Sequence, residues 1–271
     1  MKKTIILLLI FITATISAAA QRVKPADEAE LKEITSRGRL LAEYDAAAWH
    51  STDAVMATKP EKGSFNGYIA RKTGNVWTVV YGRLNEPKDK YLIVFEAIQQ
   101  ASPAEFKIKR FEEPKEDSDY FLNAARAFET AKAAFSPAER RPYNAAVLPD
   151  GDGRFLVYFV PAQTQTGIFP IGGDTRFTVS KDGSKILNTR QMHKSIIEFQ
   201  VPPGVKPETG YHTAVVDDIP EDTDVFHVLA REPKIPELIV TQKFVYRIDV
   251  DGTIRFLMTT DAFKKIGQND K

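Results

Sequence analysis

The sequence predicts an α+β protein with largely antiparallel sheet. Two segments of the first half, 27–57 and 118–135, repeat apolar residues at the three- and four-residue spacing of an amphipathic helix. Most of the second half instead alternates apolar and polar residues, with glycine-containing turns between the runs. A content of 43% hydrophobic and 27% charged residues is that of an ordinary folded chain.

The N-terminal helix is expected from Asp27 to about Ala57, because its apolar side chains return to one face. Lys59-Pro60 follows, and a residue before proline disfavours helical backbone, so the helix ends there. The apolar period then changes to two. The stretch GYIARKTGNVWTVVYGRL predicts a hairpin that turns at Thr73-Gly74-Asn75, and YLIVFEAI from Tyr91 predicts a third strand.

The second helix is expected over 118–135, with Ser118 as its N-cap and Pro137 just beyond its end. Its apolar residues fall on one stripe of the helix surface. The stripe consists of Phe121, Leu122, Ala125, Phe128 and Phe135.

The C-terminal half predicts a series of short strands and one short helix, near 220–230. Glycine in the turns between several strands supplies the positive φ that tight hairpins need. We expect two domains: 21–136, with a helix, a three-stranded meander and a helix, and a strand-rich 137–271. The linker is expected in 136–143, and one continuous sheet is the alternative. The strand segments are NAAVLP, RFLVYFVPA, TRFTVS, SKILNT, IIEFQV, YHTAVV, ELIVTQKFVYRIDV and TIRFLMT.

Residues 1–20, MKKTIILLLIFITATISAAA, have the features of a secretory signal peptide. Two lysines precede an apolar run, and Ala18 and Ala20 satisfy the small-residue rule for cleavage. We expect cleavage near Ala20 and a periplasmic or secreted protein; an uncleaved anchor is the minor alternative. The chain contains no cysteine, which excludes disulfides, thiolate metal ligands and lipid attachment at a cysteine.

Charge narrows the classes of partner. Removing residues 1–20 removes two of 37 basic residues, which leaves 35 against 36 acidic ones and a formal charge of −1. This balance, with no long basic block, argues against nucleic acid and anionic membrane surfaces as partners. No later run is long enough to span a bilayer, so stable membrane insertion is not expected. The partner is expected to be an unknown protein or small molecule.

No short motif in the chain names a reaction. The nucleophile elbow, the phosphate-binding loops and H-E-x-x-H are all missing from the sequence. Four histidines remain as candidates for chemistry. His50, His193 and His227 each lie on the apolar face of a predicted element, where a packed histidine is the ordinary interpretation. His212 is the least ordinary, because it ends a strand at an acidic turn.

The acidic turn after His212 has a simple explanation. Asp218 and Glu221 are spaced as a capping box, and Asp222 and Asp224 would face the positive end of the helix dipole. A hard-cation site built from these acids is the alternative, although the usual D-x-D-x-D-G loop is absent.

From Glu208 to Leu257 the order is a strand with a histidine, an acidic turn, a helix opening with Asp-Thr-Asp, and a strand pair. This order resembles the C-terminal half of the JAB/MPN metalloprotease fold, whose zinc motif is His-x-His-Pro, a spacer and Ser-x-x-Asp. His212 matches the first histidine, Ala214 stands at the second, and Asp222 or Asp224 approximates the aspartate.

The resemblance implies a zinc centre with His212 and Asp224 as ligands and His193 or His227 in place of the missing histidine. It also implies a general base, for which Glu198 is the convenient choice. The whole chain, including GGDTRFTVSKDGSKIL, resembles a group of secreted bacterial proteins with no assigned function.

Two functions follow from these observations. The first is an exported, non-catalytic binding or accessory module without a cofactor, for which exposed aromatic residues would supply the contact surface. The candidates for such contacts are Trp49, Trp77, Tyr81 and Tyr211. The alternative is a zinc-dependent hydrolase of JAB/MPN-like type, or its inactive descendant. An enzyme whose carboxylates show no characteristic spacing also stays open.

Overall fold

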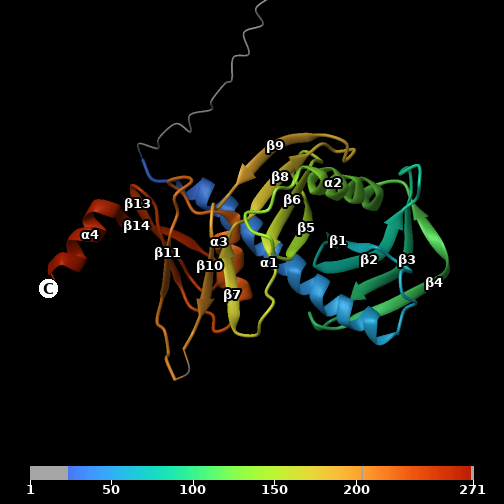
Figure 1. The fold of residues 1–271 in the computed structure, drawn as a ribbon, viewed down its shortest axis with the longest axis horizontal. Coiled ribbons are helices and arrows are strands. Elements are labelled where there is room, and N and C mark those ends of the chain that lie inside the picture. The colour runs from blue at the N-terminus through green and yellow to red at the C-terminus, as the bar shows by residue number, and fades with distance from the viewer. Residues whose placement is uncertain (1–23, 203, 270–271) are drawn as a thin grey trace, which may run out of the picture.

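The computed structural model describes residues 24–202 and 204–269, so the expected signal peptide lies outside the described residues. The α+β class is confirmed: within that range, four helices accompany strands that pair mostly antiparallel in four sheets. Figure 1 shows an elongated molecule with a sheet at each end and α1 (Glu28–Ala57) running between them. Each of these two sheets has four strands.

Helix α1 begins where the sequence predicts. The Asp27 side chain accepts a hydrogen bond from the Glu30 N–H at 2.9 Å and so caps the first turn. The helix buries residues along its whole length, from Leu31 to Val55. It therefore serves as a common support for elements at both ends of the molecule.

The first sheet follows α1 and contains the predicted hairpin and third strand, with the hairpin turn at Gly74. Its fourth strand, β4, was not predicted. The segment FKIKRFEEPKED is mostly charged and largely exposed, as suits an edge strand that must not pair with other chains. The strands, in the order in which they pair, are β1 (Gly67–Thr73), β2 (Val76–Leu84), β3 (Tyr91–Gln99) and β4 (Phe106–Asp117).

Helix α2 (Tyr120–Ala134) forms as expected, but its predicted N-cap, Ser118, is wrong. The residue at the cap is Asp119, and the Asp117 carboxylate accepts the N–H groups of Asp119 and Leu122. The acid at the end of β4 reaches the free amides of the first turn, so the serine is not needed there.

The middle of the molecule contains a four-stranded sheet and a separate two-stranded sheet. The two-stranded sheet pairs β10 with β7, a strand that the sequence did not reveal because it is short and contains Pro170. The four-stranded sheet pairs β5 (Tyr143–Pro149), β6 (Phe155–Pro161), β8 (Thr175–Val179) and β9 (Ile186–Gln191) in that order; the other pair is β7 (Ile168–Gly172) and β10 (Ile196–Gln200).

The C-terminal sheet contains the only parallel strand pair among the named strands of the described residues, β11 with β12. Helix α3 (Asp222–Ala230) makes the crossover between these two strands, as parallel pairing requires. A final helix, α4 (Thr260–Asn269), was not predicted. The strands pair in the order β11 (Gly210–Thr213), β12 (Glu237–Val240), β13 (Phe244–Ile248) and β14 (Ile254–Thr259).

Three apolar cores hold these layers together. One contains Leu41 and Tyr44 of α1 with Leu148 and Phe226 from the second half of the chain, and another joins Leu31 of α1 to the C-terminal sheet. The cores therefore cross the predicted boundary between residues 136 and 137, and the described strands form four sheets instead of one. Within residues 24–202 and 204–269, none of the helices combines the length and the apolar run that a bilayer crossing requires.

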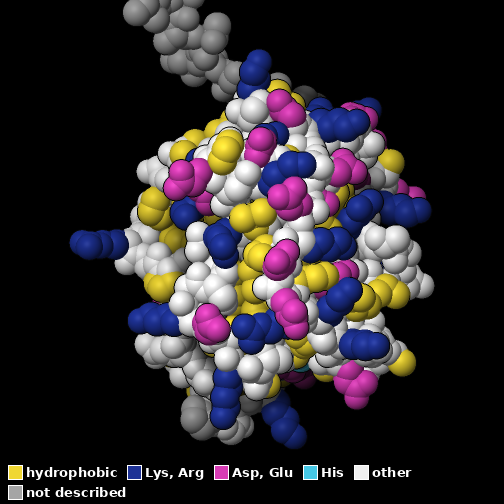
Figure 2. All heavy atoms as spheres, turned by 90° about the vertical axis from the view of Figure 1, so that its right-hand side faces the viewer, with side chains coloured by type: hydrophobic (Ala, Val, Ile, Leu, Met, Phe, Trp, Pro, Cys, Tyr) yellow, Lys and Arg dark blue, Asp and Glu magenta, His cyan; other side chains and the backbone are white. Residues whose placement is uncertain are grey.

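The face of the molecule that carries the first sheet has a mixed charge distribution. Figure 2 shows lysine and arginine side chains interspersed with aspartate and glutamate over this face, with apolar atoms between them. Neither sign of charge gathers there into a continuous patch.

The helices α1 and α3 are in close contact at Gly38. A Cβ placed on Gly38 would lie 2.5 Å from the Asp222 carbonyl oxygen and 2.5 Å from the Val225 Cβ. Glycine lowers helix propensity, so this close contact is the physical reason for its presence in mid-helix. The contact fixes where the first turn of α3 lies.

We predict that Gly38→Ala destabilises the protein by about 1–3 kcal/mol, because overpacking outweighs the gain of about 1 kcal/mol in helix propensity. Chemical denaturation would measure the change. Gly151→Ala is the matched control, since a Cβ there meets no atom within 4 Å. Stabilisation of Gly38→Ala would show that the helices separate at little cost.

Candidate metal centre

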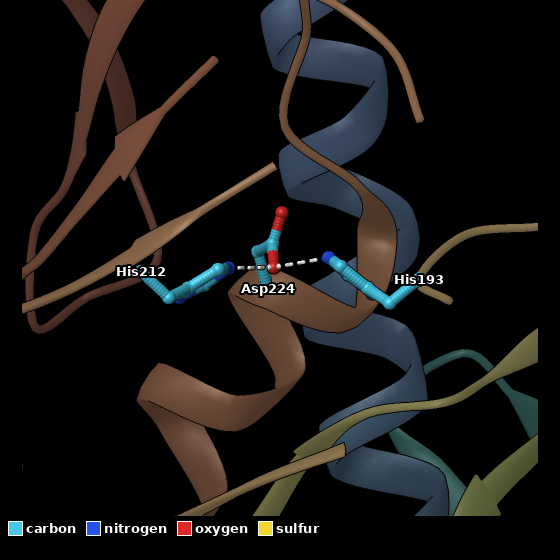
Figure 3. A group of neighbouring side chains, drawn as sticks. All are labelled: His193, His212 and Asp224. Atoms are coloured by element: carbon cyan, nitrogen blue, oxygen red, sulfur yellow. Dashed lines mark hydrogen bonds and ion pairs between the residues drawn. The ribbon is translucent and has the colours of Figure 1, made fainter. Parts of the chain in front are cut away.

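Three of the four predicted metal ligands come together in the structure. His193 lies in the connection between β9 and β10, His212 on β11, and Asp224 in the first turn of α3. One donor atom from each residue lies within 4.8 Å of the other two. Figure 3 shows both imidazole rings pointing at the Asp224 carboxylate from opposite sides.

The two Nε2 atoms converge on a single oxygen. The distance to Asp224 Oδ1 is 2.9 Å from His212 and 3.1 Å from His193. The three residues are only 6%, 7% and 1% exposed, respectively for His212, His193 and Asp224. His193 Nε2 is buried and has no described group in hydrogen-bond alignment with it. Both rings therefore face the same carboxylate oxygen, and His193 Nε2 makes no aligned hydrogen bond there.

Local backbone structure explains how two of these side chains are aimed. Side chains alternate along β11, so Tyr211 is exposed and His212 points inward. The His193 Cβ lies 3.1 Å from where a Cβ of Gly172 would be, and Gly172 has a φ of +87°. Glycine at this position lets the chain place His193 against the end of β7.

Asp224 is held by the helix that it caps. Its Oδ2 accepts the Glu221 N–H at 2.7 Å, while its Oδ1 faces the histidines. The residue at the cap of α3 is Glu221, so the predicted cap at Asp218 is wrong. Asp218 instead accepts a hydrogen bond from the Lys243 N–H at 3.1 Å. Helix capping and the candidate site thus use different oxygens of one carboxylate.

Each histidine is also held from behind by a second buried acid. His193 Nδ1 lies 2.8 Å from Asp174 Oδ1, and His212 Nδ1 lies 3.1 Å from Glu237 Oε1. Histidines that ligate metals usually donate their other ring N–H to a carboxylate, which fixes the tautomer and the ring orientation. Both rings therefore meet the requirement that leaves Nε2 free to bind a cation.

The pKa values of the clustered acids and histidines differ strongly from their usual values. Burial alone lowers the pKa of His193, but Asp174 and Asp224 outweigh it and hold that pKa well above its usual value. At His212, Asp224 and Glu237 likewise outweigh the effect of burial and raise the pKa to about 9. Burial alone raises the pKa of Asp224, but the two histidines hold it well below its usual value. The carboxylates thus attract positive charge to the two Nε2 atoms.

The negative charge of this site can be balanced equally well by two protons or by one dication. With both histidines protonated, their two positive charges and that of Arg231 balance Asp174, Asp224 and Glu237; Arg231 Nη1 lies 2.7 Å from Glu237 Oε2. Replacing the two Nε2 protons by a dication leaves the total unchanged. Ligand atoms around a tetrahedral zinc stand about 3.3 Å apart for bonds of about 2.0–2.1 Å. The two separations between Nε2 and the Asp224 oxygen, 2.9 and 3.1 Å, are close to this value, and the two Nε2 atoms lie within 4.8 Å of each other.

Three other acids of the turn, Asp217, Glu221 and Asp222, have arginine partners. Asp222 accepts from Arg37 Nε and from the Tyr158 hydroxyl, at 2.9 and 2.8 Å, and it also pairs with Arg176. Arg190 bridges Glu221 and Asp217. These pairs explain the acidic stretch without the hard-cation site that the sequence left open.

His227 and Glu198 lie outside the three-residue cluster. His227 is buried in α3 one turn beyond Asp224, and burial lowers its pKa to about 4. Glu198, the predicted general base, is on β10 with its side chain 56% exposed and 3.4 Å from Arg141. The structure therefore places no predicted base beside the two histidines.

Sequence reasoning did not identify Asp174 or Glu237 as part of the site. Asp174 follows two glycines with positive φ, and Glu237 opens a strand whose other residues are apolar. An acid at the edge of a buried strand is a usable signal, but its partner histidine cannot be found by spacing. Comparison of the chain with protein families, curated proteins and solved structures finds no match.

We predict that the metal-free protein loses stability as pH rises from about 6.5 to 9. The folded-state pKa of His212, about 9, exceeds the usual 6.5, so its contribution is complete below pH 6.5 and lost as pH passes 9. In EDTA, wild type should exceed His212→Gln by about 1–3 kcal/mol more at pH 6 than at pH 10. Denaturation midpoints measure this, with His50→Gln as control. A difference independent of pH would contradict the protonated pair.

Proposed function

We propose that this chain is an exported, non-catalytic binding module whose centre of His193, His212 and Asp224 takes one dication of the zinc class. The observation that carries the proposal is the convergence of two Nε2 atoms on one carboxylate oxygen while each Nδ1 meets a buried carboxylate. Imidazole with one carboxylate is a donor set for zinc and neighbouring transition metals. The export of the protein rests on its N-terminal sequence.

A structural role for the metal fits the position of the ligands. They come from the β9–β10 connection, β11 and α3, so a shared cation would fasten the central sheets to the C-terminal one. All three ligands are buried, which favours a metal that stabilises the fold over one that must admit a substrate. Because zinc contributes binding free energy to the folded state alone, its loss would weaken this junction first.

A zinc hydrolase of JAB/MPN-like type is the second candidate. Three protein ligands are the number that catalytic zinc sites use, and the fourth position then holds the reacting water. Within this chain His212 and Asp224 would bind the metal with His193 as the third ligand. The burial of the cluster and the distant position of Glu198 weigh against this alternative.

We expect residues 21–271, purified without a histidine tag or chelator, to contain about one zinc per chain by mass spectrometry. His212→Ala should abolish the metal, because it removes one of three ligands, and His50→Ala should retain it. EDTA should lower the melting temperature of wild type by about 5–10 °C, the shift expected for zinc at about 100 times its dissociation constant. The metal proposal would fail if the protein held no zinc after dialysis against a zinc solution and EDTA left its melting temperature unchanged. The site would then be a protonated acid–histidine network in a module without metal.

Assays with peptide and isopeptide substrates distinguish the two roles of a bound metal. The structural role predicts thermal stabilisation by zinc without turnover. Zinc-dependent cleavage that disappears in Asp224→Asn would replace the non-catalytic proposal with the hydrolase.

A further inference from the structure

A cavity of about 400 Å³ lies between α1, β7 and α3. This volume is within the range of about 300–1,000 Å³ that small-molecule sites have in proteins. Four aromatic residues and one carboxylate stand out among its lining. They are Trp49, Tyr68, Phe169, Phe226 and Asp45. His193, His212 and Asp224 do not line it, so the cavity is separate from the metal centre.

Asp45 is the unusual group in this cavity. It is half-buried on α1 and has no hydrogen bond or ion pair with any other described residue. Burial raises the pKa of its carboxyl to about 6. A desolvated carboxylate without a partner costs stability at neutral pH, and a cation placed beside it removes that cost.

The remaining charged group in the described lining is already compensated. Arg231 Nη1 lies 2.7 Å from Glu237 Oε2, and its guanidinium carbon is 4.7 Å from the centre of the Phe199 ring. His227 also lines the cavity, and its pKa of about 4 leaves it neutral. The uncompensated charge in the lining is therefore negative, which sets the sign of a ligand.

The aromatic residues indicate the rest of the ligand. Trp49 is 65% exposed, and its ring stacks on that of His50 at 5.1 Å. Rings of Trp and Tyr attract cations to their faces and offer flat apolar surface to a hydrocarbon body. Trp77 and Tyr81, which the sequence also suggested for ligand contact, are instead buried in the core at 4% and 1% exposure.

We propose that this cavity binds an organic cation with an apolar body, an ammonium compound whose charge pairs with Asp45 and whose body packs against Trp49 and Tyr68. The inference does not rest on the metal centre. A single ligand of this class would neutralise the Asp45 carboxylate and cover the apolar rings of the lining at the same time.

Calorimetric titration of residues 21–271 with benzyltrimethylammonium tests the proposal, with benzyl alcohol and phenylacetate as neutral and anionic probes. We expect the cation to bind at least about tenfold more tightly than either. Asp45→Asn should remove that preference and raise the melting temperature at pH 7.5 by about 2–6 °C, because it removes the unpaired charge. Asp53→Asn, an exposed acid on the same helix, should change neither quantity.

Trp49→Ala provides a second test that does not depend on the folding of Asp45→Asn. It should weaken binding of the cation severalfold with little change in melting temperature, because Trp49 is largely exposed. Equal affinity for the three probes, tighter binding of phenylacetate, or a cation affinity unchanged by both substitutions would overturn the proposal.

Discussion

The arrangement of the C-terminal half depends on the interactions of one group, the Asp224 carboxylate. One oxygen caps the helix that carries it, and the other meets histidines from two separate segments. Removing this group would free an amide at the start of α3 and leave two buried imidazoles without their shared partner. Polar groups left unpaired in a buried network cost more free energy of folding than the intact network contributes. Loss of one member of the cluster therefore destabilises all of it.

The helix α1 gives this carboxylate its fixed position. Gly38 lets α3 approach closely, and Arg37 pairs with Asp222 beside that contact. Tyr158 of β6 and Arg176 of β8 bind the same Asp222 carboxylate, so the first turn of α3 is held from the central sheet as well. Two neighbouring acids thus have opposite tasks: Asp222 attaches the helix to the arginines, and Asp224 faces the histidines.

Much of the fold could be predicted from local patterns. The helical spacing of Asp27–Ala57, the Gly74 turn and the strand from Tyr91 all follow from residues close together in the chain. The strands β4 and β7 could not be predicted in this way. Charged residues in β4 and Pro170 in β7 hide the alternation of apolar and polar residues. Among the metal candidates, His193 and His212 were found as residue types, but their meeting at Asp224 depends on tertiary packing. Asp174 and Glu237 carry no local sign of a histidine partner, and no spacing in the sequence connects Glu198 to the histidines.

The contact between α1 and α3 has a consequence for how the molecule reaches its final form. Arg37 and Asp222 are 185 residues apart, and α1 contributes to cores on both sides of the molecule. Contacts of such long sequence separation form late, because most of the chain must be ordered before they repay the loss of entropy. Until β11 and α3 have docked, α1 exposes apolar surface that nothing else in the first half covers. While this surface is exposed, the incomplete chain can associate with other copies, so the yield of folded protein depends on how soon the second half docks.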